Sequence, residues 1–358
     1  MVQILKTILL LSAVISVSNQ AYLGKNEQGI DVFTIQMSGD PKQRFVEPAL
    51  KYQSAIKALI TDYQQFIPSI AQKMFEKLDW IVWYFHEEHY YEIQGMAEAA
   101  GIETHLAVML NFVYEFDSYC TSLIARLSNG QIVHQRNLDF YFADHSRELV
   151  YIAKFYRGDQ YLYDGVFFGG IVATYTAYKE GSFAITLNQR SPSHSKLELA
   201  QNIARIFMGY TQSGWAIRDA LATCHNYDCA VSKLSTEPHV APSYLIISGI
   251  KDNEGIVITR DREATAHVEE LSDTQWYLVQ TNQDHYNGDC PIRCQHARQT
   301  LDLLGPVQAT SDSIYQNVLQ TWPNLNFMSI HSARFQAAQN SYSVDFIYAK
   351  NMEDPGDL

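Results

Sequence analysis

The sequence predicts an α+β protein whose mainly helical N-terminal part precedes layers of strands and helices. Before Tyr119, apolar residues recur at helical spacing, whereas after Cys120 short apolar segments alternate with turn residues, as in strands. Pairs of helical segments then separate two groups of these strands. This order favours a layered sandwich in which helices cover sheets.

The helical part follows a short strand expected at Val32–Ile35. Proline ends helices and glycine is typical of the position just beyond them. With apolar spacing, these signals predict three helices: 52–67 (ended by Pro68), one from Ile70, and Ile93–Ala100 (ended by Gly101).

The segment from Trp80 to Phe85 is the most aromatic of this half. Two interpretations are open: a helix packed on the core, or a rim that contacts lipid acyl chains or a membrane surface. In the second, Trp80 and Trp83 are candidate substrate contacts.

His86, His89 and Glu92 are residue types that bind metals. Their segment, HEEHYYE, lacks the H-E-x-x-H spacing of zinc proteases. We therefore expect a solvated helix face here, and no metal or cofactor in the protein.

The part after Cys120 combines strands with helices. Expected strands are Thr121–Leu127, Gln131–His134, Leu149–Tyr156, Gly170–Ala177, Phe183–Leu187, Tyr244–Ser248, Gly255–Thr259, Trp276–Thr281, Phe327–Ile330 and Ser343–Tyr348. Expected helices are Lys196–Met208, Gly214–Cys224, Gln295–Leu304 and Ser313–Trp322.

The composition is that of a globular protein: of 358 residues, 47% are hydrophobic and 18% charged. This length suffices for one large or two modest domains. A net charge of −13 argues against non-specific nucleic-acid binding, so no nucleic-acid partner is expected.

Residues 1–18 have the features of a secretory signal peptide. Lys6 precedes the apolar run Ile8–Val17, which is too short to span a bilayer of roughly 30 Å, and small Ser16 and Ser18 suit cleavage after Ser18. A buried first helix is the alternative. No later segment is apolar enough to span, so we expect a soluble protein of the lysosomal lumen or a secreted one.

Cys120 begins the most informative segment. Arg136 and Asp139 follow it at short range, and Asn129-Gly130 between them is a two-residue hairpin signal flanked by apolar runs. A hairpin would bring a thiol, a cation and a carboxylate together, which is what an activated sulfur nucleophile needs.

The other four cysteines form an even set that could make two disulfides in an oxidising lumen: Cys224, Cys229, Cys290 and Cys294. Four cysteines allow three connectivities, which the sequence leaves open. A zinc site from the same set is poorly supported by its spacing. Cys120 remains as a candidate reactive thiol.

Several segments resemble, in the same order, the acid ceramidase and N-acylethanolamine acid amidase family of N-terminal-nucleophile cysteine amidases, and more distantly the choloylglycine hydrolases. They are CTSLIA (120–125), HQRNLDF (134–140), LNQR (187–190), VITRDR (257–262) and WYLVQTNQD (276–284). The resemblance covers Asp31 to Ala349 and implies a four-layer αββα fold.

The resemblance also implies that the chain cuts itself between Tyr119 and Cys120. The new α-amine, whose ordinary pKa is roughly 7.7–8.0, would then serve as the base for its own thiol. The products would be an α piece, 19–119, and a β piece, 120–358, which are expected to stay associated.

By the same resemblance, Arg136 favours the thiolate and Asp139 orients the new ammonium group. Asn282 stabilises the oxyanion, and Arg293, matched across a two-residue gap, is a second catalytic arginine. A backbone N–H near Gly170-Ile171 is a candidate second oxyanion donor.

Asn188 is a candidate substrate contact, and Gln189 replaces a glutamate of ceramidase-like members, which puts substrate preference in doubt. Alternative readings are an inert buried Cys120, a structural Arg136–Asp139 pair and a turn role for Asn282. His134 could instead form a Cys–His pair, although the papain signature is absent.

The function expected is hydrolysis of a lipid amide, first an N-acylated sphingoid base as in acid ceramidase. N-acylethanolamine is the alternative substrate, and an inactive lipid-binding homologue is a further alternative. Peripheral contact with a membrane or lipid surface is expected under the second interpretation of the Trp80–Phe85 segment.

Overall fold

The computed structural model describes residues 22–67, 75–115, 118–190 and 195–347. The expected signal peptide, the helix start at Ile70 and the end of the resemblance at Ala349 lie outside these ranges. Within them, no helix combines the length and apolar character needed to cross a bilayer.

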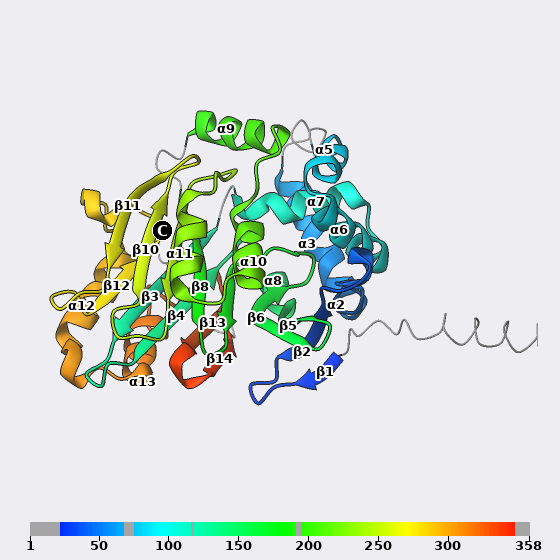
Figure 1. Cartoon of the computed structure of the whole chain (residues 1–358). Helices are drawn as coiled ribbons and strands as arrows, with labels where there is room; N and C mark the ends of the chain where they lie inside the picture. Colours follow the sequence, from blue (N-terminus) through cyan, green and yellow to red (C-terminus); the bar gives the residue numbers. More distant parts are fainter. Residues whose placement is uncertain (1–21, 68–74, 116–117, 191–194, 348–358) are drawn as a thin grey trace, which may run out of the picture.

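Two sheets form the centre of the molecule (Figure 1). The larger has nine strands, in the spatial order β1 (Tyr22–Lys25), β2 (Asp31–Gln36), β5 (Val150–Arg157), β6 (Gln160–Phe168), β7 (Thr176–Lys179), β8 (Phe183–Gln189), β9 (Ser243–Ser248), β10 (Gly255–Arg260) and β11 (Thr265–Glu270). The smaller has the order β12 (Tyr277–Gln280), β3 (Tyr119–Arg126), β4 (Ile132–Asp139), β13 (Ser329–Gln336) and β14 (Ser341–Phe346).

Helices cover both outer faces. The helices after Cys120 are α8 (Ala143–Glu148), α9 (Lys196–Phe207), α10 (Ser213–Thr223), α11 (Tyr227–Thr236), α12 (Ile292–Gln308, kinked at Gly305) and α13 (Ser311–Ile314), which continues into the π-helical turn η4 (Tyr315–Leu319). Trp215 and Leu234 of α10 and α11 pack on the larger sheet, and Leu301 of α12 packs on the smaller one. The layers are therefore αββα, as predicted.

Alternation along β3 decides what each residue contacts. Leu123 belongs to the apolar cluster under α12, whereas Ile124 packs between the sheets against Ile246 and Val257. Successive side chains of a strand point to opposite faces. The even-numbered positions of β3, including Cys120, consequently face the interior between the two sheets.

The N-terminal part contributes a helical cluster and two strands. Its helices are α2 (Val46–Lys51), α3 (Gln53–Phe66), α5 (Leu78–Phe85), α6 (Glu87–Ala100) and α7 (Thr104–Phe112), followed by the 3₁₀ turn η2 (Val113–Glu115), and they gather at one side of the molecule in Figure 1. β2 pairs in parallel with β5. The region before Cys120 is thus built into the same core as the region after it.

The predicted solvated face of α6 is wrong for Glu92. This carboxylate is fully buried and is bound by Arg218 of α10 and by Arg44, with His89 beside it. Arginine partners distant in sequence make the burial possible, and the sequence pattern of α6 alone gives no sign of them.

Several element boundaries differ from the prediction. Of the strand expected at Gly170–Ala177, only Thr176 and Ala177 are extended, as the start of β7 (Thr176–Lys179). The earlier part turns instead, because Gly170 has a φ of +95° and Ile171 N–H donates to the Phe168 carbonyl. Strands β1, β6 and β11 are not predicted. The β3–β4 turn takes three residues, Ser128–Gly130, rather than two, since Leu127 N–H donates to the Gln131 carbonyl.

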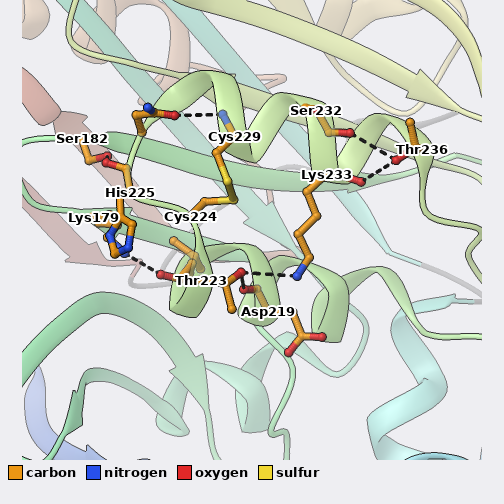
Figure 2. The surroundings of a disulfide bond; sticks show 12 residues. Lys179, Ser182, Asp219, Thr223, Cys224, His225, Cys229, Ser232, Lys233 and Thr236 are labelled. Atoms are coloured by element: carbon orange, nitrogen blue, oxygen red, sulfur yellow. Dashed lines mark hydrogen bonds between the residues drawn. A yellow bond between two sulfur atoms is a disulfide. The ribbon is translucent and has the colours of Figure 1, made fainter.

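Four cysteines form two disulfides and Cys120 is the free cysteine, as expected. The pairing, which the sequence left open, is Cys224–Cys229 and Cys290–Cys294. Figure 2 shows Cys224, at the end of α10, joined to Cys229 in the first turn of α11. Lys233 Nζ donates to Thr223 Oγ1 at 3.3 Å, which adds a second link between these helices.

Candidate active site

The β3–β4 hairpin positions the first part of the site. Its antiparallel register pairs Cys120 with Leu138 and Ser122 with Arg136. Cys120 and Arg136 therefore point into the same space between the sheets. The sequence predicted this proximity from the turn at Asn129-Gly130, and the structure has it.

The Cys120 thiol is completely buried between the sheets. Its Sγ lies 2.7 Å from Arg136 Nη2 and 3.5 Å from the Tyr114 hydroxyl. Arg136 also donates to the carbonyls of Tyr175 and Leu187, at 3.0 and 3.3 Å. Because both acceptors belong to the backbone, they hold the guanidinium beside the sulfur.

Burial raises the pKa of the Cys120 thiol, because a thiolate there would lose its hydration. The charge of Arg136 is the largest opposing effect, followed by the hydrogen bond with Tyr114, and Arg293 also lowers this pKa whereas Asp139 raises it. The sulfur is thus kept protonated, beside a cation that can stabilise its ionised form.

Both backbone polar groups of Cys120 contact residues expected in the site. Cys120 N–H donates to Asn282 Oδ1 at 2.8 Å, and Arg293 Nη1 donates to the Cys120 carbonyl at 2.7 Å. Arg293 Nη2 also donates to Asn282 Oδ1, at 2.9 Å. The Asn282 amide nitrogen donates to the carbonyls of Gln189 and Ser118, so both of its hydrogens are engaged.

Asp139 lies on the opposite face of the hairpin from the thiol, because its register partner is Tyr119. The buried carboxylate accepts from Ser329 Oγ and Asn326 Nδ2 and lies 3.5 Å from Arg293 Nη1. Burial raises its pKa, and Arg293 is the largest opposing effect. Asp139 thus reaches Cys120 through Arg293 rather than directly.

Arg293 occupies the first turn of α12, and the Cys290–Cys294 disulfide closes the chain around it. Its side chain is buried, also contacts Thr121 Oγ1 at 3.2 Å and lies 6.0 Å from the centre of the Tyr119 ring. The prediction for Arg293 rested on a gapped match, and the structure brings this residue to both sides of the Tyr119–Cys120 bond.

Three of the segments used for the resemblance meet at Arg190. Its guanidinium donates twice to Asp284, at 2.7 Å each, and once to Asp261. Although burial raises the pKa of Asp284, the hydrogen bonds from Arg190 hold it below the ordinary range. Asp284 lies two positions after Asn282, so this ion triad fixes the loop that carries Asn282.

Two residues predicted to contact the substrate, Asn188 and Gly170, instead make hydrogen bonds within the fold. Asn188 is fully buried: it accepts from Ser122 Oγ and donates to the carbonyls of Gln280 and Thr281, linking the two sheets. The Gly170 carbonyl accepts from Asn111. Neither shows a contact with Cys120 among the hydrogen bonds of the described residues.

Trp80 and Trp83 lie on the exposed side of α5, while Ile81 and Val82 of the same helix are buried. His134 is buried between the sheets, where its ring nitrogens contact Ser248 and Thr186 rather than the thiol. Burial lowers the pKa of His134 to about 3, so the ring stays neutral.

The sequence analysis missed Tyr114, Ser329 and Asn326. Tyr114 precedes Cys120 closely, but only the turn η2 directs it to the sulfur. Ser329 and Asn326 are 190 and 187 residues from Asp139 in the chain and meet it because β13 pairs with β4. A spacing pattern cannot reveal contacts of this kind.

A cavity of about 510 Å³ lies at the end of β4, directly after Asp139. Its wall is mostly aromatic and apolar with a polar margin, and it is formed by Asp62, Phe140, Tyr141, Phe142, Ala143, Asp144, His145, Arg147, Phe327 and Met328. The Tyr141 ring lies 6.1 Å from the ring of Tyr119, measured between centres. The cavity therefore adjoins the residue before Cys120.

Comparison with protein-family models gave no match. Among solved structures, a Caenorhabditis elegans N-acylethanolamine-hydrolyzing acid amidase ortholog is 32% identical, with a TM-score of 0.57, over 61% of this chain and 93% of the other. The N-acylethanolamine-hydrolyzing acid amidase of Mus musculus is 26% identical over 319 residues, 86% of each chain. The acid ceramidase of Balaenoptera acutorostrata scammoni is 27% identical over 349 residues, 90% of this chain and 87% of the relative. This chain thus belongs to the acid ceramidase and N-acylethanolamine acid amidase family of N-terminal-nucleophile cysteine amidases.

Proposed function

We propose that this protein is a lipid amidase that hydrolyses N-acylated sphingoid bases after cutting itself before Cys120. One observation carries the proposal. The Cys120 thiol lies 2.7 Å from Arg136, and the backbone of Cys120 is held by Asn282 and Arg293. The nucleophile and a cation thus lie beside the Tyr119–Cys120 peptide bond, whose N–H donates to Asn282 Oδ1, while Arg293 binds the carbonyl on the other side of Cys120. Acyl transfer from an amide requires a nucleophile and charge stabilisation placed together in this way.

In the maturation step, Cys120 Sγ bonds to the Tyr119 carbonyl carbon and the bond from that carbon to the Cys120 nitrogen breaks. The thiol proton ends on this nitrogen, which becomes an amine. Water then hydrolyses the thioester, giving a Tyr119 carboxyl group and a free thiol. No further reactant is needed.

The mature site would use the same neighbours for lipid amides. The α-amine of Cys120 takes the thiol proton and later delivers it to the leaving amine. Asn282 Oδ1, 2.8 Å from this nitrogen in the uncut chain, orients it, and Arg136 favours the thiolate. Asp139 balances the positive charge of Arg293, which lies between this carboxylate and Cys120. Asn282 Nδ2 is the donor for the oxyanion once its present acceptor, the Ser118 carbonyl, has moved away.

The cavity beside Tyr119 is the proposed binding site for the lipid. Its aromatic wall suits apolar chains, and its size falls in the range of small-molecule sites. The thiol is fully buried in the uncut chain, so a substrate in the cavity cannot reach it there. Displacement of Tyr119 after the cut would open a path between the cavity and the thiol.

The acyl-sphingoid substrate is favoured by the acid ceramidase match, which spans 90% of the chain. N-acylethanolamine is the second candidate, favoured by the solved relative at 32% identity. Asn188 does not help to choose, because its side chain is already bound by Ser122 and two backbone carbonyls.

An aromatic patch supports contact with a lipid surface. It consists of Trp80, Trp83, Tyr84, Phe85 and Met208, all more than two-fifths exposed. Phe85 packs on Gly209, which joins the end of α5 to the segment after α9. Aromatic side chains with apolar bodies suit a membrane interface, and residues 1–18 would direct the protein to the secretory route.

The test is intact mass and N-terminal sequencing of the secreted chain held at about pH 4.5, together with turnover of ceramide and palmitoylethanolamide. A fragment beginning Cys120-Thr121-Ser122, absent from Cys120→Ala, and hydrolysis of either lipid support the proposal. An uncut chain that binds lipid without hydrolysing it would instead identify an inactive lipid-binding homologue. Relative turnover of the two lipids separates the two substrates.

A further inference from the structure

Tyr114 contacts the sulfur from the other side of the proposed cut. It precedes Cys120 by six residues, yet its hydroxyl lies 3.5 Å from Cys120 Sγ, and both side chains are fully buried. The maturation step and the mature site described above do not use this contact.

Two kinds of contact, ring stacking and a hydrogen bond, fix the position of the Tyr114 hydroxyl. Its ring stacks on that of Tyr175, with centres 3.8 Å apart and planes 15° apart, and it lies beside Phe140. Its hydroxyl donates to the Leu187 carbonyl at 2.5 Å. The ring is thus held by stacking and the oxygen by a backbone acceptor.

The same Leu187 carbonyl accepts from Arg136 Nη2, which also donates to Cys120 Sγ. Tyr114, Leu187, Arg136 and Cys120 therefore form a closed ring of hydrogen bonds. Since a phenol oxygen both donates and accepts, it can accept from the S–H group while it donates to Leu187. When the thiolate forms, the one hydroxyl hydrogen turns from the Leu187 carbonyl to the sulfur, and Leu187 keeps the hydrogen bond from Arg136. One side chain then serves both protonation states of the sulfur.

We propose that Tyr114 is a catalytic residue of the self-cleavage step. This inference rests on the proposed function, because the contact matters for catalysis only if Cys120 is the nucleophile. The hydroxyl holds the thiol in place and donates to the sulfur as negative charge gathers on it. After the cut Tyr114 remains on the 19–119 piece, so the site of the 120–358 piece alone is incomplete.

The charges around the thiol agree with a neutral donor here. Arg136 faces it from β4, whereas Asp139 of the same strand acts from the other face of the hairpin and Arg293 acts from α12. Burial, and then the charge of Cys120, hold the pKa of Tyr114 well above its ordinary value. The phenol therefore stays protonated, and able to donate, at acidic and neutral pH.

The test compares Tyr114→Phe with Tyr175→Phe in the full chain. Each loses one hydroxyl from the same stack, but the Tyr175 hydroxyl has no hydrogen-bond partner among the described residues. Uncut protein prepared at neutral pH is moved to buffers between about pH 4 and 8, and cutting is followed by intact mass. For Tyr114→Phe we expect a rate lowered roughly tenfold or more and a pH midpoint moved upward, because the thiolate loses a donor. Tyr175→Phe should stay within about twofold of the wild type.

Equal rates and equal midpoints for the two variants would overturn the inference while wild-type cutting keeps the proposed function. A wild-type chain that stays uncut overturns both. Should Tyr114→Phe not fold, 3,5-difluorotyrosine at position 114 keeps the hydroxyl and strengthens it as a donor. It should move the pH midpoint downward, and an unmoved midpoint contradicts the role.

Discussion

Arg218 of α10 binds Glu92 of α6 through two buried hydrogen bonds, Nη1 to Oε2 at 2.5 Å and Nη2 to Oε1 at 2.8 Å. Arg44 also donates to Glu92, at 2.8 Å. Glu92 lies before the proposed cut and Arg218 after it. This pair therefore connects the two proposed pieces through the core, without a covalent bond.

We expect Arg218→Met to destabilise the protein by about 3–5 kcal/mol, because it leaves a buried carboxylate without its main partner. Thermal unfolding measures the change, and gel filtration of cut protein shows whether the pieces separate. Glu98→Gln, which breaks the exposed pair with Lys42, is the control and should cost less than about 1 kcal/mol. Equal losses would mean that Glu92 is not the link.

Arg136→Met should slow self-cleavage roughly a hundredfold, because the thiol loses its nearest cation. Intact mass over time gives the rate. Arg126→Met is the matched control: this arginine lies at the other end of the same hairpin and pairs with exposed Asp273. If Arg136→Met cuts itself at the wild-type rate, the guanidinium of Arg136 has no part in the cleavage mechanism.

Loss of either disulfide should lower stability, but only loss of Cys290–Cys294 should also slow self-cleavage. Each closes a loop of only a few residues, so each contributes about 2 kcal/mol to stability. Replacing Cys290 and Cys294 by Ser should also reduce cutting severalfold, because Arg293 lies within that loop. Replacing Cys224 and Cys229 should lower the melting temperature alone. Similar cutting in both double variants would contradict the link to Arg293.

Glu115 should make the fold more stable in acid. Burial raises its pKa from about 4.5 to about 8, the Ser213 N–H being a weaker opposing effect. A folded-state pKa above the unfolded value gives stability that is complete below about pH 4.5 and is lost as pH rises toward 8, on the order of 4 kcal/mol. Melting temperatures between pH 4 and 8 should therefore fall less in Glu115→Gln than in the wild type. A parallel decline in both proteins would exclude Glu115 as the source.

The aromatic patch should govern binding to lipid surfaces. Trp80→Ser combined with Trp83→Ser should reduce co-sedimentation with anionic vesicles severalfold, because two exposed aromatic rings no longer enter the interface. Leu303→Ser is the control, since Leu303 is 88% exposed but lies on α12. Loss of binding in the control to the same extent would mean that the patch has no special part.

The sequence could predict contacts between residues that are close together in the chain, but not contacts between distant ones. The β3–β4 hairpin depends on a local turn signal, and it brought Cys120 and Arg136 together as expected. Asp139 was expected beside the thiol, but alternation along β4 puts it on the other face, where Ser329 and Asn326 hold it. Those partners come from a distant part of the chain.

Two of the missed strands, β6 and β11, have a similar explanation. β6 contains Asp164 and Gly165 in its middle, which argues against a buried strand until Lys154 is found 2.6 Å from Asp164. β11 is an edge strand whose alternate residues are exposed, so its apolar signal is weak. Likewise, Glu92 appeared suited to a solvated face until Arg218 and Arg44 supplied its charge partners.

The alternation along β3 has a consequence for changes in chain length. Adding one residue between Cys120 and Ile124 would turn the thiol toward α12, away from Arg136, although composition and hydropathy would hardly change. The turn at Ser128–Gly130 lies beyond both paired segments, so extra residues there leave every side chain on its face. An epitope or a fluorescent label placed in this turn would therefore report on maturation without altering the register that maturation depends on.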